Sequence, residues 1–259
     1  MSAIEYLRKI RDILGYVEKS EMDKISRAAG FMAEAIASGG RIYMFGSGHS
    51  VIPVLDIFPR YGSFVGFFPL YDPRLMWFNV IGPGGARELL WLERQAGYAR
   101  VFLQSYPLEE CDCMLVFSHG GLNTVPIDVA LEAKSRGLKV ISVSSLQNAA
   151  SAARTHPSGK MLPDIADIAI DNGVPPEDAL IDVGRLEKVA AGSTVAAVAV
   201  AMSLVAETAA VLARKGRVPP TFVSPNVKGV PQDHMNRVYQ AFTDFYFSRG
   251  PKPGSGQDG

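Results

Sequence analysis

Turns rich in glycine and hydroxyl side chains follow three short apolar segments of the sequence, where buried strands would end. Residues 46–50 read GSGHS, residues 118–124 read SHGGLNT, and Ser144 and Ser145 follow the third segment. Glycines let the backbone approach a ligand closely, and hydroxyl groups donate hydrogen bonds without adding charge. A helix that begins right after such a turn adds free N–H groups and a positive dipole end. This combination predicts a binding site for a phosphomonoester on a polar molecule.

Two common nucleotide-binding loops do not fit these turns. After Gly46 and Gly48 the third glycine of a G-x-G-x-x-G motif is replaced by Val51, which argues against dinucleotide binding. The sequence contains no G-K-S or G-K-T, so the phosphate loop of nucleoside triphosphatases is absent as well. The alternative interpretation of any single turn is ordinary capping of a helix by serine or asparagine. Three such turns at one sheet edge favour a binding site.

Short, mostly continuous apolar runs predict the strands that position these turns, as is typical of strands buried on both faces. Between the third and fourth runs, residues 125–137 predict a helix with Pro126 in its first turn and Gly137 at its end. Strand, helix and strand at this spacing imply right-handed parallel crossovers. The fold class is therefore α/β: a doubly wound, mostly parallel sheet between two helical layers, with its ligand site at the carboxyl ends of the strands. The five predicted strands are residues 41–45, 63–70, 113–117, 139–143 and 165–170.

Apolar residues at helical spacing predict two helices within residues 1–38 and a long helix that begins at Ser193. The apolar run 193–206 is shorter than the ~20 residues of a membrane span. It predicts a buried helix, and its apolar character almost all round suggests contact with a second subunit. We expect one domain over residues 1–250, and a disordered tail over 251–259. Residues 71–86 predict either a loop over the site or a plain connection.

Composition excludes several classes of function. Lys and Arg together number 26, as do Asp and Glu, so the formal net charge of zero argues against nucleic acid or a membrane surface as a partner. The only cysteines, Cys111 and Cys113, cannot form a disulfide framework, and the charged first residues do not read as a secretory signal. We therefore expect a cytoplasmic protein. Histidines and cysteines without ligand spacing predict no metal, and we expect no cofactor.

The turns and the segments around them resemble the SIS (sugar isomerase) domain. The resemblance rests on GSGHS, on SHGGLNT and on residues 166–172, which read ADIAIDN. Residues 153–173, 192–195 and 223–236 further resemble a subfamily described as phosphoheptose-isomerase-like. The resemblance covers nearly the whole chain and implies a fold that binds phosphorylated sugars.

The sequence departs from the family pattern at two positions. Gly120 stands where SIS domains usually have a second serine, and Thr124 could supply a hydroxyl group instead. Asp56 matches the position at which phosphoheptose isomerases place a catalytic glutamate on the helix after the first turn. The resemblance also implies that His234 lies on the last helix, where isomerases of this family sometimes bring a histidine across a dimer interface.

An aldose–ketose isomerisation needs a base that moves a proton between adjacent carbons. It also needs a group that transfers the proton of the oxygen. Asp56 is either this base or the ion-pair partner of Arg60, four residues further on. Glu88 and Glu93 lie on the helix before the third strand, where a solvated face is the alternative, and Glu207 is either a base or a paired buried acid. The catalytic candidates are Asp56, Glu93, Glu207 and His234.

The binding candidates are the polar residues of the turns, of a loop before the fifth strand and of the start of the long helix. His49 and His119 are expected to line the pocket, with hydrogen bonding to the ligand favoured over proton transfer. His156, Ser158 and Lys160 form a loop that either reaches a phosphate or is solvated. The full set is Ser47, Gly48, His49, Ser50, Ser118, His119, Gly121, Asn123, Thr124, Ser144, Ser145, His156, Ser158, Lys160, Ser193 and Thr194.

These features together predict a phosphosugar-binding enzyme. An aldose–ketose isomerase that acts on a sugar phosphate or amino-sugar phosphate comes first, and a related lyase or etherase second. The alternative from another class is a non-catalytic phosphosugar-binding or regulatory SIS module. We expect a small-molecule partner, no nucleic acid, no membrane, and a homodimer or higher homo-oligomer.

Overall fold

A sheet of five parallel strands lies at the centre of the computed structural model, which describes residues 1–76 and 85–249. The strand order is β2-β1-β3-β4-β5, so the chain starts inside the sheet and winds outward in both directions. The central strands β1 and β3 are buried over their whole length, which explains their continuous apolar sequence. The strands are β1 (Ile42–Gly46), β2 (Phe67–Pro69), β3 (Cys113–Phe117), β4 (Lys139–Ser144) and β5 (Ile168–Asp171).

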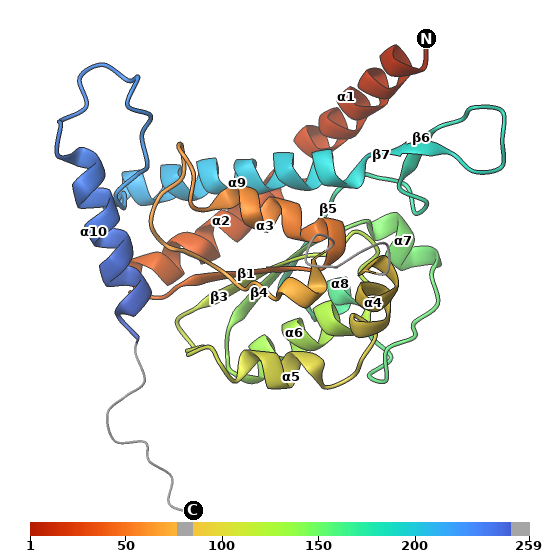
Figure 1. Ribbon diagram of the computed structural model, residues 1–259, viewed down its shortest axis with the longest axis horizontal. Coiled ribbons are helices and arrows are strands. Elements are labelled where there is room, and N and C mark those ends of the chain that lie inside the picture. The colour runs from red at the N-terminus through yellow and green to blue at the C-terminus, as the bar shows by residue number, and fades with distance from the viewer. Residues whose placement is uncertain (77–84, 250–259) are drawn as a thin grey trace, which may run out of the picture.

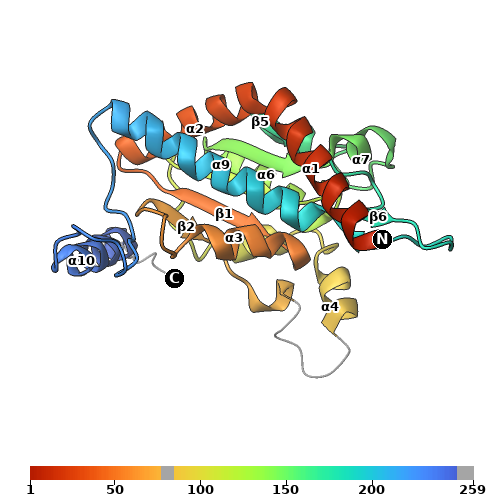
Figure 2. The same cartoon turned by 90° about the horizontal axis from the view of Figure 1, so that it is seen from above.

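Two layers of helices cover the sheet, and alternate strand residues pack against each layer. Ile42 and Met44 of β1 face the layer that contains α2 and α9, whereas Tyr43 and Phe45 face the layer that contains α5 and α6. Figure 2 shows α1, α2, α3 and α9 over the first face. The first layer consists of α1 (Ser2–Ser20), α2 (Met22–Ala37), α3 (Val51–Ile57) and α9 (Ser193–Arg214). The second contains α5 (Tyr98–Leu103), α6 (Thr124–Ser135) and α8 (Leu162–Ile165).

The predicted doubly wound parallel sheet and the two N-terminal helices are confirmed. The second strand is shorter than predicted, because only Phe67–Pro69 pairs with β1. The fifth strand begins at Ile168, since Leu162–Ile165 forms the short helix α8. The predicted loop over residues 71–86 falls partly on residues 77–84, which lie outside the described residues, as does the predicted tail 251–259. The remaining short elements are η1 (Gly48–Ser50), η2 (Pro73–Leu75), α4 (Gly85–Leu92) and α7 (Leu146–Ser151).

An antiparallel hairpin, which the sequence did not predict, interrupts the chain between β5 and α9. Its strands β6 (Ala179–Ile181) and β7 (Val189–Ala191) project from the sheet beside the first half of α1 (Figure 1). Helix α9 then runs along the sheet from the hairpin. By length and composition α9 could also cross a membrane. Here it packs against α2 and α3 and buries Val200, Leu204 and Leu212, while Val195 stays exposed. The second subunit expected on α9 stays a prediction.

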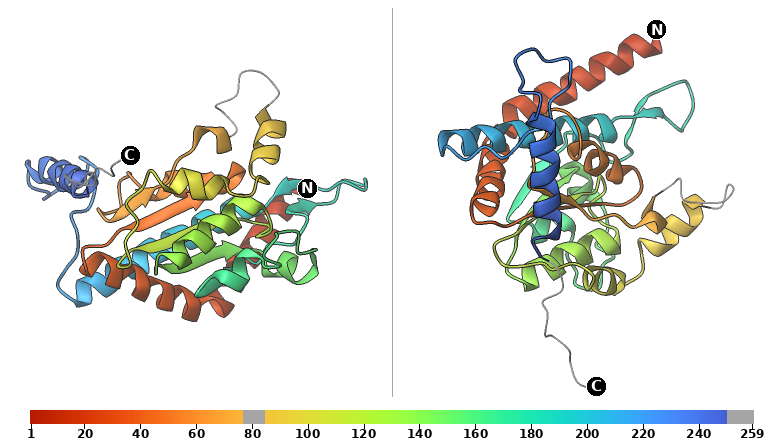
Figure 3. Two further views of the ribbon diagram at one scale, coloured as in Figure 1. Left: turned by 90° about the horizontal axis from the view of Figure 1, so that it is seen from below. Right: turned by 60° about the vertical axis from the view of Figure 1, so that its left-hand side comes forward.

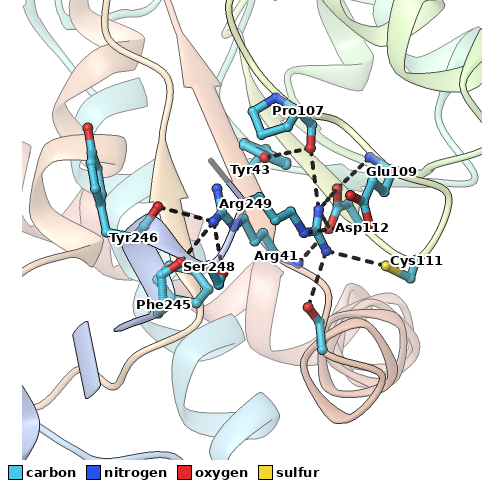
Figure 4. A network of polar contacts seen from close by, with 11 residues as sticks. Arg41, Tyr43, Pro107, Glu109, Cys111, Asp112, Phe245, Tyr246, Ser248 and Arg249 are labelled. Atoms are coloured by element: carbon cyan, nitrogen blue, oxygen red, sulfur yellow. Dashed lines mark hydrogen bonds and ion pairs between the residues drawn. The ribbon is translucent and has the colours of Figure 1, made fainter. Parts of the chain in front are cut away.

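The C-terminal helix α10 (His234–Phe247) lies at the opposite end of the molecule from the hairpin (Figure 3). Two arginines, Arg41 and Arg249, connect α10 and the residue after it to the segments that precede β1 and β3 (Figure 4). Arg41, just before β1, donates to the backbone oxygens of Phe245 and Tyr246, and its guanidinium lies 5.0 Å from the ring centroid of Phe68. This contact satisfies carbonyl groups at the end of α10 that have no partner within the helix.

Arg249, which follows α10, makes the second attachment. Its Nη1 donates to both carboxylate oxygens of Asp112 at 2.8 and 2.7 Å, and its Nη2 donates to the backbone oxygen of Gly39. The Asp112 side chain is fully buried and also accepts from the N–H groups of Arg41 and Glu109. A buried carboxylate held by this many donors costs free energy when one of them is removed.

We predict that Arg249→Met lowers the free energy of unfolding by about 3 kcal/mol, because it leaves the buried Asp112 carboxylate without its counter-charge. The matched control is Arg237→Met, since Arg237 of α10 pairs at the surface with Asp233, the residue before this helix, at 3.3 Å. That change should stay within about 0.5 kcal/mol. Urea unfolding of the full chain measures both values. Equal effects of the two changes would contradict the attachment described here.

Candidate functional site

A cavity of about 260 Å³ opens at the carboxyl ends of β1 and β3, where the sequence predicted the ligand site. A narrower cavity adjoins it, toward β5 and the first turn of α9. The two share the residues His49, Ser50, Ser118, His119 and Ser193, and we call them together the cleft. The larger cavity is also lined by Ser47, Gly48, Leu89, Leu90, Glu93, Gly120, Asn123, Pro126 and Asp178, and the narrower by Phe117, Val143, Asn172, Thr194 and Ala197.

The first turn is tight because β1 ends in a glycine. A Cβ atom at Gly46 would lie only 2.0 Å from the backbone oxygen of Ser50, so a larger residue would force this turn open. Gly48 has a φ of +60°, the left-handed region that favours glycine. The turn thereby folds back over the end of the strand and places Ser47 and His49 on the wall of the cleft.

Glu93, at the end of α4, brings a buried carboxylate to the cleft. Its exposed fraction is only 5%. The hydroxyl of Ser47 donates to its Oε2 and the side-chain amide of Asn123 donates to its Oε1, both at 2.8 Å. The N–H of Val125 donates to its backbone oxygen at 2.9 Å. Glu93 therefore connects the turn after β1 with the turn after β3.

Burial raises the pKa of the Glu93 carboxyl above its ordinary value, and the hydrogen bond from Ser47 opposes this shift only in part. The nearby positive charge of Arg94 also favours the ionised form, more weakly. A carboxyl group whose pKa is raised holds a proton more firmly than an ordinary carboxyl group, and its carboxylate is a stronger base. Such a group suits general acid–base chemistry.

His119 presents a hydrogen-bond donor that has no partner in the described part of the chain. The N–H of Val174 donates to Asn172 Oδ1 at 3.0 Å, so the Nδ2 of Asn172 donates to Nδ1 of His119 at 3.2 Å. The proton of a neutral His119 then resides on Nε2, and this atom is buried without a hydrogen-bond partner. Because an unpaired buried donor is costly, it marks a place for an acceptor atom of a ligand.

The acidic residue Asp178 also lines the cleft, and the sequence analysis did not identify it. It precedes the hairpin and lies beside the first turn of α9. Its Oδ1 accepts from the N–H groups of Gly192 and Ser193 at 3.0 and 2.7 Å, and its Oδ2 accepts from the Ser193 hydroxyl at 2.8 Å. No sequence motif marks Asp178, because the segment that leads into the hairpin has no periodic signal.

Three predicted catalytic residues lie away from the cleft. Asp56 on α3 forms an ion pair with Arg60 at 2.6 Å, the alternative that the spacing had suggested. Glu207 pairs with Arg214 at 3.5 Å toward the far end of α9. The Nε2 of His234 is 2.8 Å from the backbone oxygen of Thr221, at the start of α10. None of the three is among the described residues that line the cleft.

The loop with His156 is held by local contacts instead of facing the cleft. The N–H of Ser158 donates to His156 Nδ1 at 3.1 Å, so the proton of a neutral His156 lies on Nε2, 3.0 Å from Asp128 Oδ1. Ser158 and Lys160 are exposed. This arrangement ties the loop to α6.

The remaining binding candidates have varied surroundings. Ser145 donates to the backbone oxygen of Val174 and accepts from the N–H of Asn148, so its hydroxyl group caps α7. Ser144 is completely buried, and Gly121 donates its N–H to the hydroxyl of Ser118. The structure brings to the cleft Ser47, Gly48, His49, Ser50, Glu93, Ser118, His119, Asn123, Ser193 and Thr194, but not Gly121, Thr124, Ser144, Ser145, His156, Ser158 or Lys160.

No group of three or more potential metal ligands is found among residues 1–76 and 85–249.

Comparison with known proteins places this architecture in a family. The model of the SIS domain matches residues 5–145, which contain β1, β3, β4 and most of the cleft. The chain belongs to the SIS domain family. It is 34% identical to a UPF0309 protein of Oceanobacillus iheyensis over 93% of this chain and 96% of that protein. It is 35% identical to a UPF0309 protein of Geobacillus thermodenitrificans over 93% of this chain and 94% of that protein.

Solved structures are similar to this chain over much of its length at low sequence identity. A phosphoheptose isomerase from Francisella tularensis is 14% identical, with a TM-score of 0.49 over 82% of this chain and 96% of that one. The protein c3406 of E. coli CFT073 is also 14% identical, with a TM-score of 0.45 over 78% of this chain and 86% of that one.

We predict that Glu93→Gln stabilises the fold at neutral pH. Glutamine can accept from Asn123 and donate to Ser47, so it keeps both contacts while removing a buried charge. Because the pKa of Glu93 is higher in the folded chain than in the unfolded chain, the native protein loses stability as the pH rises above the ordinary carboxyl pKa. The glutamine variant lacks this loss.

Thermal unfolding between pH 4 and pH 8 measures this effect, with roughly 2–4 °C in Tm expected for each kcal/mol. The advantage of Glu93→Gln should grow with pH and vanish near pH 4. The control is Glu88→Gln, an exposed glutamate on the same helix, which should leave the pH profile unchanged. A Tm difference that is constant across this range would show that charge burial is not its cause.

Proposed function

We propose that this protein binds a phosphorylated sugar in the cleft and isomerises it between aldose and ketose forms. One observation carries the proposal: a buried carboxylate of raised pKa and an unpartnered imidazole N–H belong to the same cleft. The isomerisation requires a base for a carbon-bound proton and a donor for a carbonyl oxygen. Glu93 and His119 are the residues of the cleft that fit these two roles.

Glu93 acts as the base in this proposal. Its carboxylate removes the proton from the carbon next to the carbonyl group, and the carbonyl oxygen takes up the Nε2 proton of His119 to give an enediol. The carboxyl group of Glu93 then returns its proton to the neighbouring carbon, while the other hydroxyl group gives its proton back to Nε2 of His119 and becomes the new carbonyl. Two hydrogen bonds from Ser47 and Asn123 hold the carboxylate in place throughout. No net gain or loss of atoms or electrons occurs.

His119 acts on the carbonyl and hydroxyl oxygens of the sugar in this proposal. Its Nε2–H donates a hydrogen bond, which stabilises the negative charge that develops on the carbonyl oxygen as the carbon proton leaves. Asn172 fixes the ring through Nδ1, so the donor needs no reorganisation when the substrate reacts. A donor placed in advance contributes more to the rate than one that must first be oriented.

The turn after β3 is the place for the phosphate group. Ser118 and Gly120 line the larger cavity, and α6 begins directly after this turn. Asn123, the residue before α6, makes no side-chain cap to that helix, and its amide donates to Glu93. In the first turn of α6 the N–H of Val125 already donates to the backbone oxygen of Glu93, and Pro126 has no N–H, so the Ser118 hydroxyl and the backbone of the turn are the groups proposed to hold the phosphate.

Proton exchange tests the proposal. The full chain is incubated in deuterated water with a panel of pentose, hexose, heptose and amino-sugar phosphates, and incorporation at the carbon next to the carbonyl is followed by NMR. We expect exchange with at least one sugar phosphate. Glu93→Gln should reduce it by ~10²-fold or more, because the base is lost while the packing remains.

The controls separate the candidate bases. Asp56→Asn and the exposed Glu88→Gln should both keep exchange within about twofold. If Asp56→Asn lost exchange and Glu93→Gln kept it, the base would be Asp56 on α3 and not Glu93. Binding of sugar phosphates without exchange of any of them would instead favour the non-catalytic SIS module.

A further inference from the structure

Away from the cleft, a serine, a histidine and an aspartate are joined by hydrogen bonds in the order that nucleophilic catalysis requires. Ser158 and His156 belong to the loop between α7 and α8, and Asp128 lies within α6. The Oγ of Ser158 is 2.7 Å from Nδ1 of His156, and Nε2 of His156 is 3.0 Å from Oδ1 of Asp128. A nucleophile, a base beside it and a third group that orients the base together activate a hydroxyl group.

The backbone of the loop decides where the protons lie in this series of contacts. The N–H of Ser158 donates to Nδ1 of His156 at 3.1 Å, so Nδ1 carries a lone pair and no proton. In the contact of 2.7 Å the Ser158 hydroxyl is therefore the donor, and Nδ1 is able to accept its proton. The proton of the neutral ring lies on Nε2 and points to the Asp128 carboxylate, which stabilises the ring when it gains a second proton.

The exposure of the three side chains also suits a reactive hydroxyl group. His156 is only 7% exposed, whereas Ser158 is exposed. Asp128 is held in place, because its Oδ2 accepts from the N–H of Gly97 at 3.1 Å. The N–H of Lys160 donates to Oγ of Ser158 at 3.3 Å, which favours negative charge on that oxygen. The base is thus shielded from water, while the hydroxyl group meets reactants directly from solvent.

We propose that Ser158, His156 and Asp128 form a catalytic triad that hydrolyses small carboxylic esters. Nδ1 of His156 takes the hydroxyl proton of Ser158 while Oγ forms a bond to the carbonyl carbon of the ester. The bond from this carbon to the alcohol oxygen then breaks, and the alcohol takes the proton from Nδ1. Water next attacks the acyl-serine, its proton passes through Nδ1 to Oγ, and the carboxylic acid leaves.

Ester and water thereby become carboxylic acid and alcohol, and the three side chains return to their first state. This activity is separate from the proposed isomerisation, since none of the three residues is among the described residues that line the cleft.

Reaction of the full chain with p-nitrophenyl acetate tests the proposal. Release of p-nitrophenol is followed by absorbance, and the acetylated residue is identified by peptide mass spectrometry after an acid quench. We expect acetyl-Ser158 in the folded protein and none in urea, where the triad is dispersed. The internal control is Ser151, an exposed serine whose hydroxyl donates to the backbone oxygen of Gln147 and which should stay unmodified. Absence of acetyl-Ser158 in the folded protein, or equal labelling of Ser151, would overturn the proposal.

Asp128→Asn tests the orientation of the imidazole ring. The asparagine oxygen keeps the contact with the Gly97 N–H, so the amide nitrogen donates to Nε2 of His156 and moves the ring proton to Nδ1, where it blocks the base. The part of the release rate that Ser158→Ala abolishes should fall by ~10²-fold or more.

The matched control for this change is Glu132→Gln, because Glu132 lies one turn further along α6 and pairs with Arg136. It should keep the rate within about twofold of the parent. Equal rates in Asp128→Asn and the parent protein would contradict the triad. If Asp128→Asn fails to fold, which circular dichroism reveals, the labelling of Ser158 in the parent protein still decides the question.

Discussion

The carboxylate of Glu93 is the contact on which the geometry of the cleft depends. It accepts from Ser47 in the turn after β1 and from Asn123 in the turn after β3, and both partners follow neighbouring strands of the sheet. Because the group is buried, neither hydrogen bond is readily exchanged for one to water. The backbone oxygen of Glu93 also accepts from the N–H of Val125, in the first turn of α6. One side chain thus sets the separation of two turns and the chemistry between them.

The sequence was sufficient to predict the fold because its signals are local and repeated. Continuous apolar runs such as residues 113–117 are typical of strands covered on both faces, and β3 has the predicted bounds. Pro126 correctly located the start of α6, since proline is tolerated only in the first turn. The turns after β1 and β3 do meet at one edge, because parallel neighbouring strands end on the same side.

The choice among the carboxylates could not be made from sequence. Asp56 matched a family position, but its spacing to Arg60 equally fitted an ion pair, and burial and hydrogen bonding decide between such alternatives. Glu93 was named with the other candidates, yet its two partners are 46 and 30 residues away. Asp178 was not named from the sequence, and Asn172 entered only as the last residue of a segment that resembles the family, because each acquires its role through contacts that only the folded chain provides.

Residue Thr221, late in the sequence, pairs with a segment near the edge of the sheet that is synthesised much earlier. Strand β2 is an edge strand, and the stretch just before it is covered by an antiparallel bridge between Phe64 and Thr221. Ribosomes add about 5–20 residues per second, so Thr221 emerges roughly 8–30 s after Phe64. During synthesis this edge is therefore exposed to pairing with other chains for that interval, a period in which unprotected strands aggregate. The bridge to Thr221 thus protects this edge in the finished protein but not while the chain is being made.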